Sequence, residues 1–466
     1  METVNYRKSF ILLTSLFFMW GFITVMNDVL INTFKGIFNL TSVQQSFIQL
    51  AFFGAFFIVS LIYFLISTSS GRDPINRIGY KNGMVISLIV CGLGCLAFYP
   101  AAQMESYGAF LTALFILATG VTFLQICANP YATILGPENS ASSRLNLAQG
   151  FNSLGTTIGP LVGTILIYKI FSSGEQTPES VGKTYVFYGM AFILIAIFVW
   201  FSKMPAFSNE EKIESGSGVF KHRHLVLGIF AIFFYVGSEV SVGSWIVKFI
   251  MQEDIAGLEE ANASYYLSYF WGGLMIGRLM ASISLSQGLS EMKKLIYMPL
   301  ISLAVFFFIF FVTSIKIENG SVHFEFLGFN QIALFLLFLL INYLAFIFGK
   351  GNPSSSLVIF SSINLVLLSI AIFAKGELAF WSIIGTGLFF SIGWSNIFSL
   401  AIKDLGKLTS QGSSLLVMAI VGGAALPNIQ SQIIDAQGVQ ISFIIPLIGM
   451  LYLIFYGLKG YKIKQI

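Results

Sequence analysis

Charged residues are scarce in this chain of 466 residues, where they make up only 10% of the total, against roughly a quarter in soluble domains. Hydrophobic residues make up 56% and include 49 phenylalanines, and the mean hydropathy is +0.83. The composition excludes a soluble globule and predicts an all-α polytopic membrane protein. The net charge of +4 is spread over many loops, so we expect no nucleic-acid partner.

Cysteine and histidine are also rare, with three of each. The cysteines all lie within apolar runs, so we expect buried thiols rather than a disulfide or metal framework. The histidines form no ligand cluster in the sequence. These residues are Cys91, Cys95, Cys127, His222, His224 and His323. We therefore expect no cofactor and no metal site.

Motifs of catalysis and nucleotide hydrolysis are missing as well. The sequence contains no phosphate-binding P-loop and no Ser/His/Asp grouping, and its loops are too short to hold an ATPase domain. We therefore expect no enzymatic activity. Any uphill transport would have to draw its energy from an ion gradient.

The chain does contain a series of apolar stretches, about fourteen of them, each of the roughly twenty residues that a bilayer requires. If the first begins in the cytoplasm, 19 of the 25 Lys and Arg residues, including Arg278, fall on the cytoplasmic side. An excess of positive charge marks that side, so we predict that both termini are cytoplasmic. The stretches are at about 9–34, 43–67, 82–102, 107–135, 146–171, 184–202, 225–250, 263–284, 294–315, 330–349, 356–374, 378–401, 412–434 and 442–460.

The longest polar stretch in the interior of the sequence, 203–224, follows the sixth apolar stretch. It is typical of a cytoplasmic linker, here between an N-terminal transmembrane bundle (1–202) and a C-terminal one (225–466). Helix-bundle transporters are commonly built from two six-helix halves, so the second half has two stretches too many. We predict an inserted helix pair at about 294–349, joined by an external loop at 316–329.

Two carboxylates interrupt the apolar stretches. Asp28 follows Asn27 in the first stretch, and Glu239 lies between Gly237 and Gly243 in the seventh. Acidic residues at membrane depth are costly and mark ion or substrate pathways, so both are candidates for coupling transport to a cation. The alternatives are that Asp28 caps a helix at the membrane surface and that Glu239 makes a structural hydrogen bond.

Amide side chains lie on two helix faces near a proline. Gln125 and Asn129 are four residues apart and Gln149 and Asn152 are three apart, so each pair shares one face. Pro130 bends the first helix and frees backbone carbonyls. Amides both donate and accept hydrogen bonds, which suits the hydroxyls of a neutral sugar. The two faces therefore predict a sugar cavity, and the alternative is that the amides hold neighbouring helices together.

Trp271 and Trp394 lie near glycines or near the amide of Asn396. Aromatic faces can stack on a sugar and the amide can bind its hydroxyls, although packing in the core explains either tryptophan as well. We include Asn396 among the candidate sugar-binding residues.

Longer segments carry a family resemblance. They include "FFMWGF…MNDVL" (17–30), "LQICANPYATILGPENSASSRLNLAQGFNSLG" (124–155), "FYVGSEVSVGSW" (234–245), "YFWGGLMIGR" (269–278) and "WSNIFSLAIKDLG" (394–406). In these segments the chain resembles the fucose:proton symporter family of the major facilitator superfamily, whose relatives include glucose/galactose transporters. The resemblance covers nearly the whole chain apart from the predicted helix pair.

The resemblance implies a major facilitator fold and alternating access around a central cavity between two bundles. It implies a monosaccharide held by Asn27, Gln149 and Asn152, and a proton carried by Asp28. The chain departs from fucose symporters at Gln125, where they have a second acid and glucose/galactose-like members have glutamine. It also has Asn76 where the superfamily usually has an aspartate.

We therefore predict a secondary active transporter that imports a glucose- or galactose-like hexose, rather than fucose, with a cation. A proton is the expected cation and sodium is the alternative. We expect a monomer in the bacterial inner membrane. Two other readings stay open: a sugar-binding membrane sensor or scaffold that does not transport, and an exporter of drugs or lipids. The polar amides disfavour an exporter.

Overall fold

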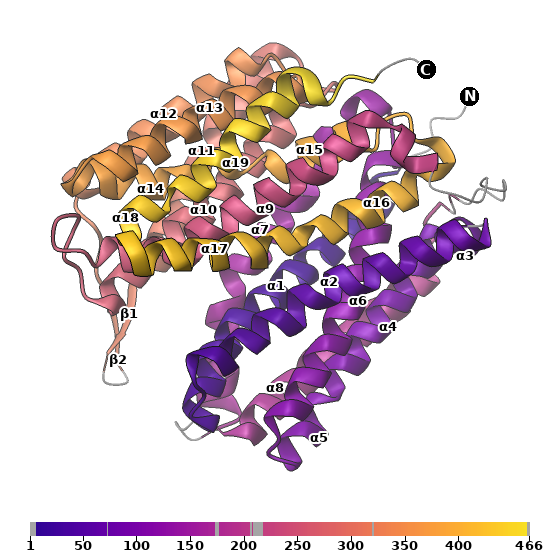
Figure 1. Cartoon of the computed structure of the whole chain (residues 1–466), viewed down its shortest axis with the longest axis horizontal. Helices are drawn as coiled ribbons and strands as arrows, with labels where there is room; N and C mark the ends of the chain where they lie inside the picture. Colours follow the sequence, from indigo (N-terminus) through magenta and orange to yellow (C-terminus); the bar gives the residue numbers. More distant parts are fainter. Residues whose placement is uncertain are drawn as a thin grey trace. The chain divides into compact units, whose positions relative to one another are not determined.

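The computed structural model describes residues 6–71, 73–172, 177–205, 207, 218–318 and 321–463. These residues are almost entirely helical (Figure 1). The chain divides into two compact units, and each is described by itself. Unit 1 comprises Met1–Pro137, Leu154–Leu225 and Ile402–Val421, and unit 2 comprises Glu138–Ser153, Val226–Ala401 and Gly422–Ile466.

Unit 1 contains most of the first half of the chain and one segment of the second. Its elements are α1 (Arg7–Phe38), α2 (Ser42–Ser70), α3 (Pro74–Ile78), α4 (Tyr80–Leu96), α5 (Phe98–Gln103), α6 (Tyr107–Ile134), the end of α7 (Ala141–Ile165), η2 (Leu166–Ile170), α8 (Pro178–Phe201), η3 (Gly218–Lys221), η4 (Gly406–Leu408), α16 (Thr409–Met418) and η5 (Ala419–Val421).

Unit 2 contains the start of α7 and most of the second half of the chain. Its other elements are η1 (Glu138–Ser140), α9 (Arg223–Ile250), α10 (Glu260–Ser284), α11 (Glu291–Ser314), β1 (Ile315–Glu318), β2 (Ser321–Phe324), α12 (Phe329–Gly349), α13 (Pro353–Phe373), α14 (Gly376–Phe390), α15 (Gly393–Ala401), α17 (Gly422–Gln437), α18 (Val439–Ser442), α19 (Ile444–Phe455) and η6 (Tyr456–Gly460).

Twelve helical segments in the described part of the chain are long and apolar enough to cross a membrane. Two more helices, α7 and α10, have 25 residues each, which gives a length of about 37 Å. Each of the fourteen predicted apolar stretches coincides with one of these fourteen segments, so the helical membrane architecture is confirmed. Half of the predicted linker at 203–224 lies outside the described residues.

Local sequence explains several helix starts. The side chain of Thr41 accepts a hydrogen bond from the amide of Gln44, whose side chain in turn accepts one from the amide of Thr41. At α13, the side chain of Asn352 accepts from the amides of Ser354 and Ser355. These caps satisfy amides that have no partner inside the helix.

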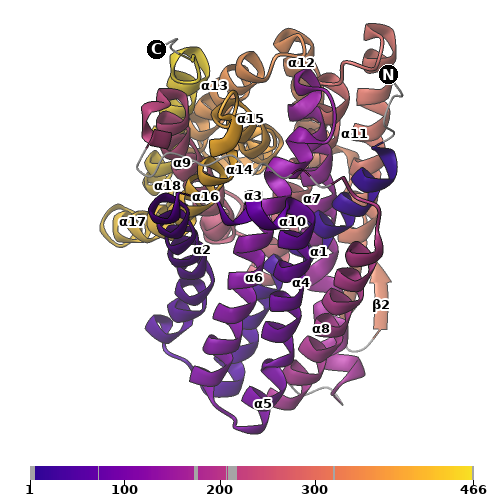
Figure 2. The ribbon, with the colours of Figure 1, turned by 90° about the vertical axis from the view of Figure 1, so that its right-hand side faces the viewer.

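The helices of unit 1 pack in a fixed pattern, with α4 along α6 and α8, and α2 along α6 (Figures 1 and 2). The crossing of α4 and α6 is tight because a Cβ atom on Gly94 would collide with the backbone of Leu117, and one on Gly120 with the backbone of Cys91. Glycine therefore allows the two backbones to approach closely.

Unit 2 repeats this pattern, with α13 along α14 and α19, and α10 along α14. The correspondence leaves α11 and α12 without counterparts in the first half of the chain. They pack on α10, α13 and α14. The predicted insertion at about 294–349 would account for this difference.

A hydrogen bond near Pro299 joins α11 to α12. Pro299 has no amide hydrogen, so the carbonyl of Leu295, four residues earlier, lacks its usual helical partner. The hydroxyl of Tyr343 in α12 donates to that carbonyl at 3.2 Å. Pro299 therefore leaves a carbonyl in α11 unpaired within its own helix, and α12 supplies the donor to it.

The segment at 316–329, predicted as an external loop, contains regular structure that was not anticipated. Its first part forms an antiparallel pair, β1 and β2, in which Ile315 faces Phe324. The sequence signal is an Asn-Gly pair flanked by β-branched residues, which is typical of a hairpin. The hairpin also packs on the end of α11, where the ring centroids of Phe311 and Phe324 lie 5.8 Å apart.

Candidate functional site

Gln125 and Asn129 in α6 are fully buried in unit 1. Neither nitrogen nor either oxygen of these two side-chain amides has a hydrogen-bond partner. A buried amide without partners costs about 1–3 kcal/mol. Gln125 and Asn129, one helical turn apart in α6, therefore have unused hydrogen-bonding capacity.

Asn27 in α1 is also buried. Its Nδ2 atom donates to Oε1 of Gln49 in α2 at 3.3 Å, while its own oxygen has no partner. Asp28 follows it in α1, but its side chain lies outside the described part of the structure. Asn27, the residue before the predicted coupling acid Asp28, therefore has a side-chain oxygen that is free to accept a hydrogen bond.

Pro130 lies inside α6 and leaves the carbonyl of Ile126 without its helical donor. The hydroxyl of Ser413 in α16 donates to that carbonyl at 3.2 Å, and α16 lies beside α2 and α6 within unit 1. Pro130 therefore contributes to the packing of α16 against α6, in addition to bending the helix.

Asp73 caps the short helix α3, in the connection between α2 and α4. Oδ1 accepts from the hydroxyl of Tyr63 at 2.6 Å and from the amides of Ile75 and Asn76, while Oδ2 accepts from Ser67 at 3.1 Å. Burial raises the pKa of Asp73 above its ordinary value, and these hydrogen bonds oppose that rise. An acid is thus present in this loop, three residues before Asn76.

Neutral hydrogen bonds join α2, α3 and α4 to η4 and the start of α16. Nδ2 of Asn76 donates to the carbonyl of Lys407 at 3.1 Å, and the hydroxyls of Tyr80 and Ser410 lie 3.0 Å apart. Nε2 of Gln411 donates to Ser67 at 2.9 Å. Amides and hydroxyls therefore make these contacts.

The start of α7 makes the corresponding contacts in unit 2. Nδ2 of Asn146 donates to Oδ1 of Asn396 at 3.1 Å, and Nδ2 of Asn396 donates to the carbonyl of Pro353 at 3.1 Å. The hydroxyl of Ser142 bonds that of Ser399. Asn396, a predicted sugar-binding residue, thus has both of its amide groups engaged.

Gln149 and Asn152 also belong to the part of α7 in unit 2, and both are buried. Nε2 of Gln149 has no hydrogen-bond partner. The nearby tryptophan Trp394 is buried too, with no partner for its ring nitrogen. Nε2 of Gln149 and the ring nitrogen of Trp394 therefore have unused capacity to donate a hydrogen bond.

Glu239 lies in α9, and its Oε2 atom is 3.9 Å from Nη2 of Arg278 in α10. The same oxygen accepts no hydrogen bond. Arg278 is 7% exposed, so its guanidinium lies inside the protein, whereas the sequence analysis counted it only as a positive charge on the cytoplasmic side. The signal that would have found it is a basic residue within the apolar run "YFWGGLMIGRLM".

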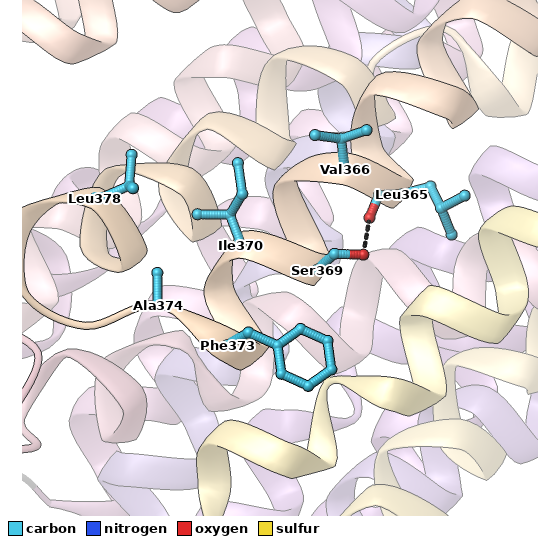
Figure 3. A pocket seen from close by; sticks show the side chains of 7 residues that line it. All are labelled: Leu365, Val366, Ser369, Ile370, Phe373, Ala374 and Leu378. Carbon is cyan, nitrogen blue, oxygen red and sulfur yellow. Dashed lines mark hydrogen bonds between the residues drawn. The ribbon is translucent and has the colours of Figure 1, made fainter.

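A surface hollow of about 470 Å³ lies at the end of α13 and the start of α14 (Figure 3). Its lining is apolar except for Ser369, whose hydroxyl donates to the carbonyl of Leu365 at 2.8 Å. With its single hydroxyl already bonded, this hollow lacks the convergent polar groups of a sugar site.

Comparison with known proteins places the chain in a family. The model of the Major Facilitator Superfamily matches residues 13–324. The chain is 40% identical to a glucose/galactose transporter of Brucella abortus over 98% of this chain and 95% of that one. It is 34% identical to a putative glucose/galactose transporter of Helicobacter pylori, covering 97% of each chain.

A solved structure agrees with these relatives. The crystal structure of the Escherichia coli fucose:proton symporter FucP matches with a TM-score of 0.73 and 26% identity, over 99% of this chain and 100% of that one. These similar proteins are named as transporters, which confirms the expectation that the chain is not an enzyme. The apolar helices confirm an integral membrane protein. This chain belongs to the major facilitator superfamily.

Proposed function

We propose that this chain is a secondary active transporter that imports a glucose- or galactose-like hexose by alternating access, driven by a proton gradient. The observation that carries the proposal is the set of buried amides without partners in a chain 40% identical to a glucose/galactose transporter. Amides bind neutral hydroxyls without needing a charge. The similarity to a fucose:proton symporter supports the proton as the coupling cation.

The proposed sugar-binding residues combine all the amides singled out above. They are Asn27, Gln125, Asn129, Gln149, Asn152 and Asn396. Four of them, at 27, 125, 129 and 149, have buried amide atoms without partners. Asn396 can join them only if a sugar hydroxyl replaces one of its bonds to Asn146 or to the Pro353 carbonyl.

Coupling is proposed to fall on Asp28 first and on Glu239 second. Fucose symporters have a second acid at the position of Gln125, and a glutamine cannot carry a proton. This difference disfavours fucose as the substrate and leaves Asp28 and Glu239 as the candidate coupling acids. A carboxylate alternates between its protonated and charged forms as its surroundings become drier or wetter. We further propose a monomer in the bacterial inner membrane with both termini in the cytoplasm.

The test is uptake of labelled sugar into proteoliposomes that contain the full chain. An inwardly directed proton gradient should drive accumulation of glucose and galactose more strongly than of fucose, and a protonophore should abolish it. Accumulation that follows a sodium gradient and ignores pH would contradict proton coupling. Sugar binding without uptake under either gradient would instead identify a sensor or scaffold.

A further inference from the structure

One guanidinium in unit 2 contacts three different helices. Nη1 of Arg278 in α10 donates to the hydroxyl of Ser153 in α7 at 2.6 Å. Its Nε atom donates to the carbonyl of Ser391, at the end of α14, at 3.3 Å. Its Nη2 atom faces Oε2 of Glu239 in α9 at 3.9 Å, too far for a hydrogen bond.

The distances show where this guanidinium is held. A guanidinium that pairs with an ionised carboxylate forms hydrogen bonds of about 2.7–2.9 Å, so Nη2 would have to move about 1 Å towards Glu239. The guanidinium is planar and rigid, and its other nitrogens would move with it. Pairing with Glu239 and the bond to Ser153 therefore compete.

Ser153 is the last residue of α7 that belongs to unit 2. The segment Glu138–Ser153 belongs to unit 2, and the segment Leu154–Leu225 that follows it belongs to unit 1. The proposed sugar-binding residues Gln149 and Asn152 lie within one helical turn before Ser153. Gly150 allows α7 to approach α10, because a Cβ atom there would meet Cδ2 of Leu279 at 2.5 Å.

We propose that Arg278 is a positioning residue that transmits the charge of Glu239 to α7. When Glu239 is protonated, Arg278 donates its hydrogen bond to Ser153 and keeps this part of α7 packed against α10. When Glu239 is ionised, the guanidinium turns to the carboxylate and releases Ser153. This inference rests on the proposed function for its purpose, since it links a coupling acid to the helix that carries Gln149 and Asn152.

The surroundings of Glu239 favour this exchange. Among the described residues, the titratable groups that face Glu239 are Arg278 from α10 and Tyr235 from its own helix, one turn earlier. A carboxylate whose side chain is only 14% exposed is stabilised by a positive partner when it is charged. Arg278 is the cation placed to supply it.

Hydrogen–deuterium exchange of the full chain in nanodiscs tests the proposal without any sugar. The readout is the exchange rate of peptides covering 146–156, corrected for the intrinsic effect of pH. In the wild type, exchange should increase by about five-fold or more as Glu239 ionises. Glu239→Gln should keep exchange slow at every pH, and Ser153→Ala should make it fast at every pH.

Variants of the cation complete the test. Arg278→Gln should remove the pH dependence, and so should Arg278→Lys, which keeps the charge but lacks the fork that reaches both partners. The matched control is Lys248→Gln, which removes a cation from the far end of α9, 5.5 Å from the ring of Trp245, and should behave as the wild type.

Two results would overturn the proposal. One is a wild-type pH dependence that persists in Glu239→Gln or in a folded Arg278 variant. The other is slow exchange in Ser153→Ala at low pH. Because the readout needs no sugar, these failures differ from a failure of hexose uptake in proteoliposomes, which would contradict the proposed function alone.

Discussion

The hydroxyl of Tyr63 donates a 2.6 Å hydrogen bond to Oδ1 of Asp73. This bond ties the body of α2 to the loop that follows it, and Ser67 and two backbone amides complete the set around the carboxylate. The loop is therefore organised around a buried acid. Its neighbour Asn76 uses its own amide to reach the carbonyl of Lys407.

Asp73→Asn is expected to change how stability depends on pH. Burial raises the pKa of Asp73 in the folded protein, so the folded state binds the proton more tightly than the unfolded chain. Its contribution to stability is full below the unfolded pKa of about 3.9 and is lost as pH rises through the folded pKa. Thermal unfolding at pH 4–7 should therefore show the wild type losing stability relative to Asp73→Asn as pH rises. The reverse trend would mean that the hydrogen bonds outweigh burial.

Pro130 and Ser413 are expected to be energetically coupled. Ser413→Ala removes the donor to the Ile126 carbonyl and should cost about 0.6–1.7 kcal/mol, the range for such bonds in membrane helices. In a Pro130→Ala background the helix supplies its own donor to that carbonyl, so the same change should cost less. Unfolding free energies of the four proteins in this double-mutant cycle measure the coupling, and additive effects would contradict it.

Gln149→Ala and Asn152→Ala are each expected to weaken hexose binding by about ten-fold or more, because a lost buried hydrogen bond costs about 1–3 kcal/mol. Binding titrations of purified protein measure this effect. Asn342→Ala is the matched control. Its amide donates to the carbonyl of Leu388, so its loss should lower stability and leave affinity unchanged. Wild-type affinity in both test variants would assign these amides to helix packing.

Asp28→Asn is expected to abolish gradient-driven accumulation of hexose and to preserve exchange across the membrane, since asparagine imitates the neutral acid. Glu239→Gln should reduce accumulation less and should alter its pH profile. Counterflow and accumulation assays in the same proteoliposomes separate the two effects. Uphill accumulation by Asp28→Asn but not by Glu239→Gln would reverse this ranking.

Membrane topology is expected to show in the labelling of single cysteines. Lys221→Cys and Lys403→Cys should react with an impermeant thiol reagent only from the cytoplasmic side, and Glu325→Cys only from outside. The native thiols Cys91, Cys95 and Cys127 are fully buried and should stay silent. Cytoplasmic labelling of Glu325→Cys would contradict the fourteen-segment topology.

The local sequence was sufficient to predict the helices. A run of about twenty apolar residues crosses a bilayer as a helix because every backbone group must be satisfied within the segment. The buried amides of Gln125, Asn129, Gln149 and Asn152 were also predictable, since polar groups stand out against an apolar run. The β1–β2 hairpin was missed although its Asn-Gly signal is local.

Only the tertiary structure decided which groups those residues meet. The partners of Arg278 come from α7, α9 and α14, and the donor to the carbonyl freed by Pro130 comes from α16, almost three hundred residues away. Asn396 is predicted to bind a sugar, and only the structure shows that its amide bonds to Asn146 and to the carbonyl of Pro353. Hydrophobic periodicity specifies that a segment is a helix, but polar partners depend on how helices distant in sequence pack together, and no local pattern encodes that.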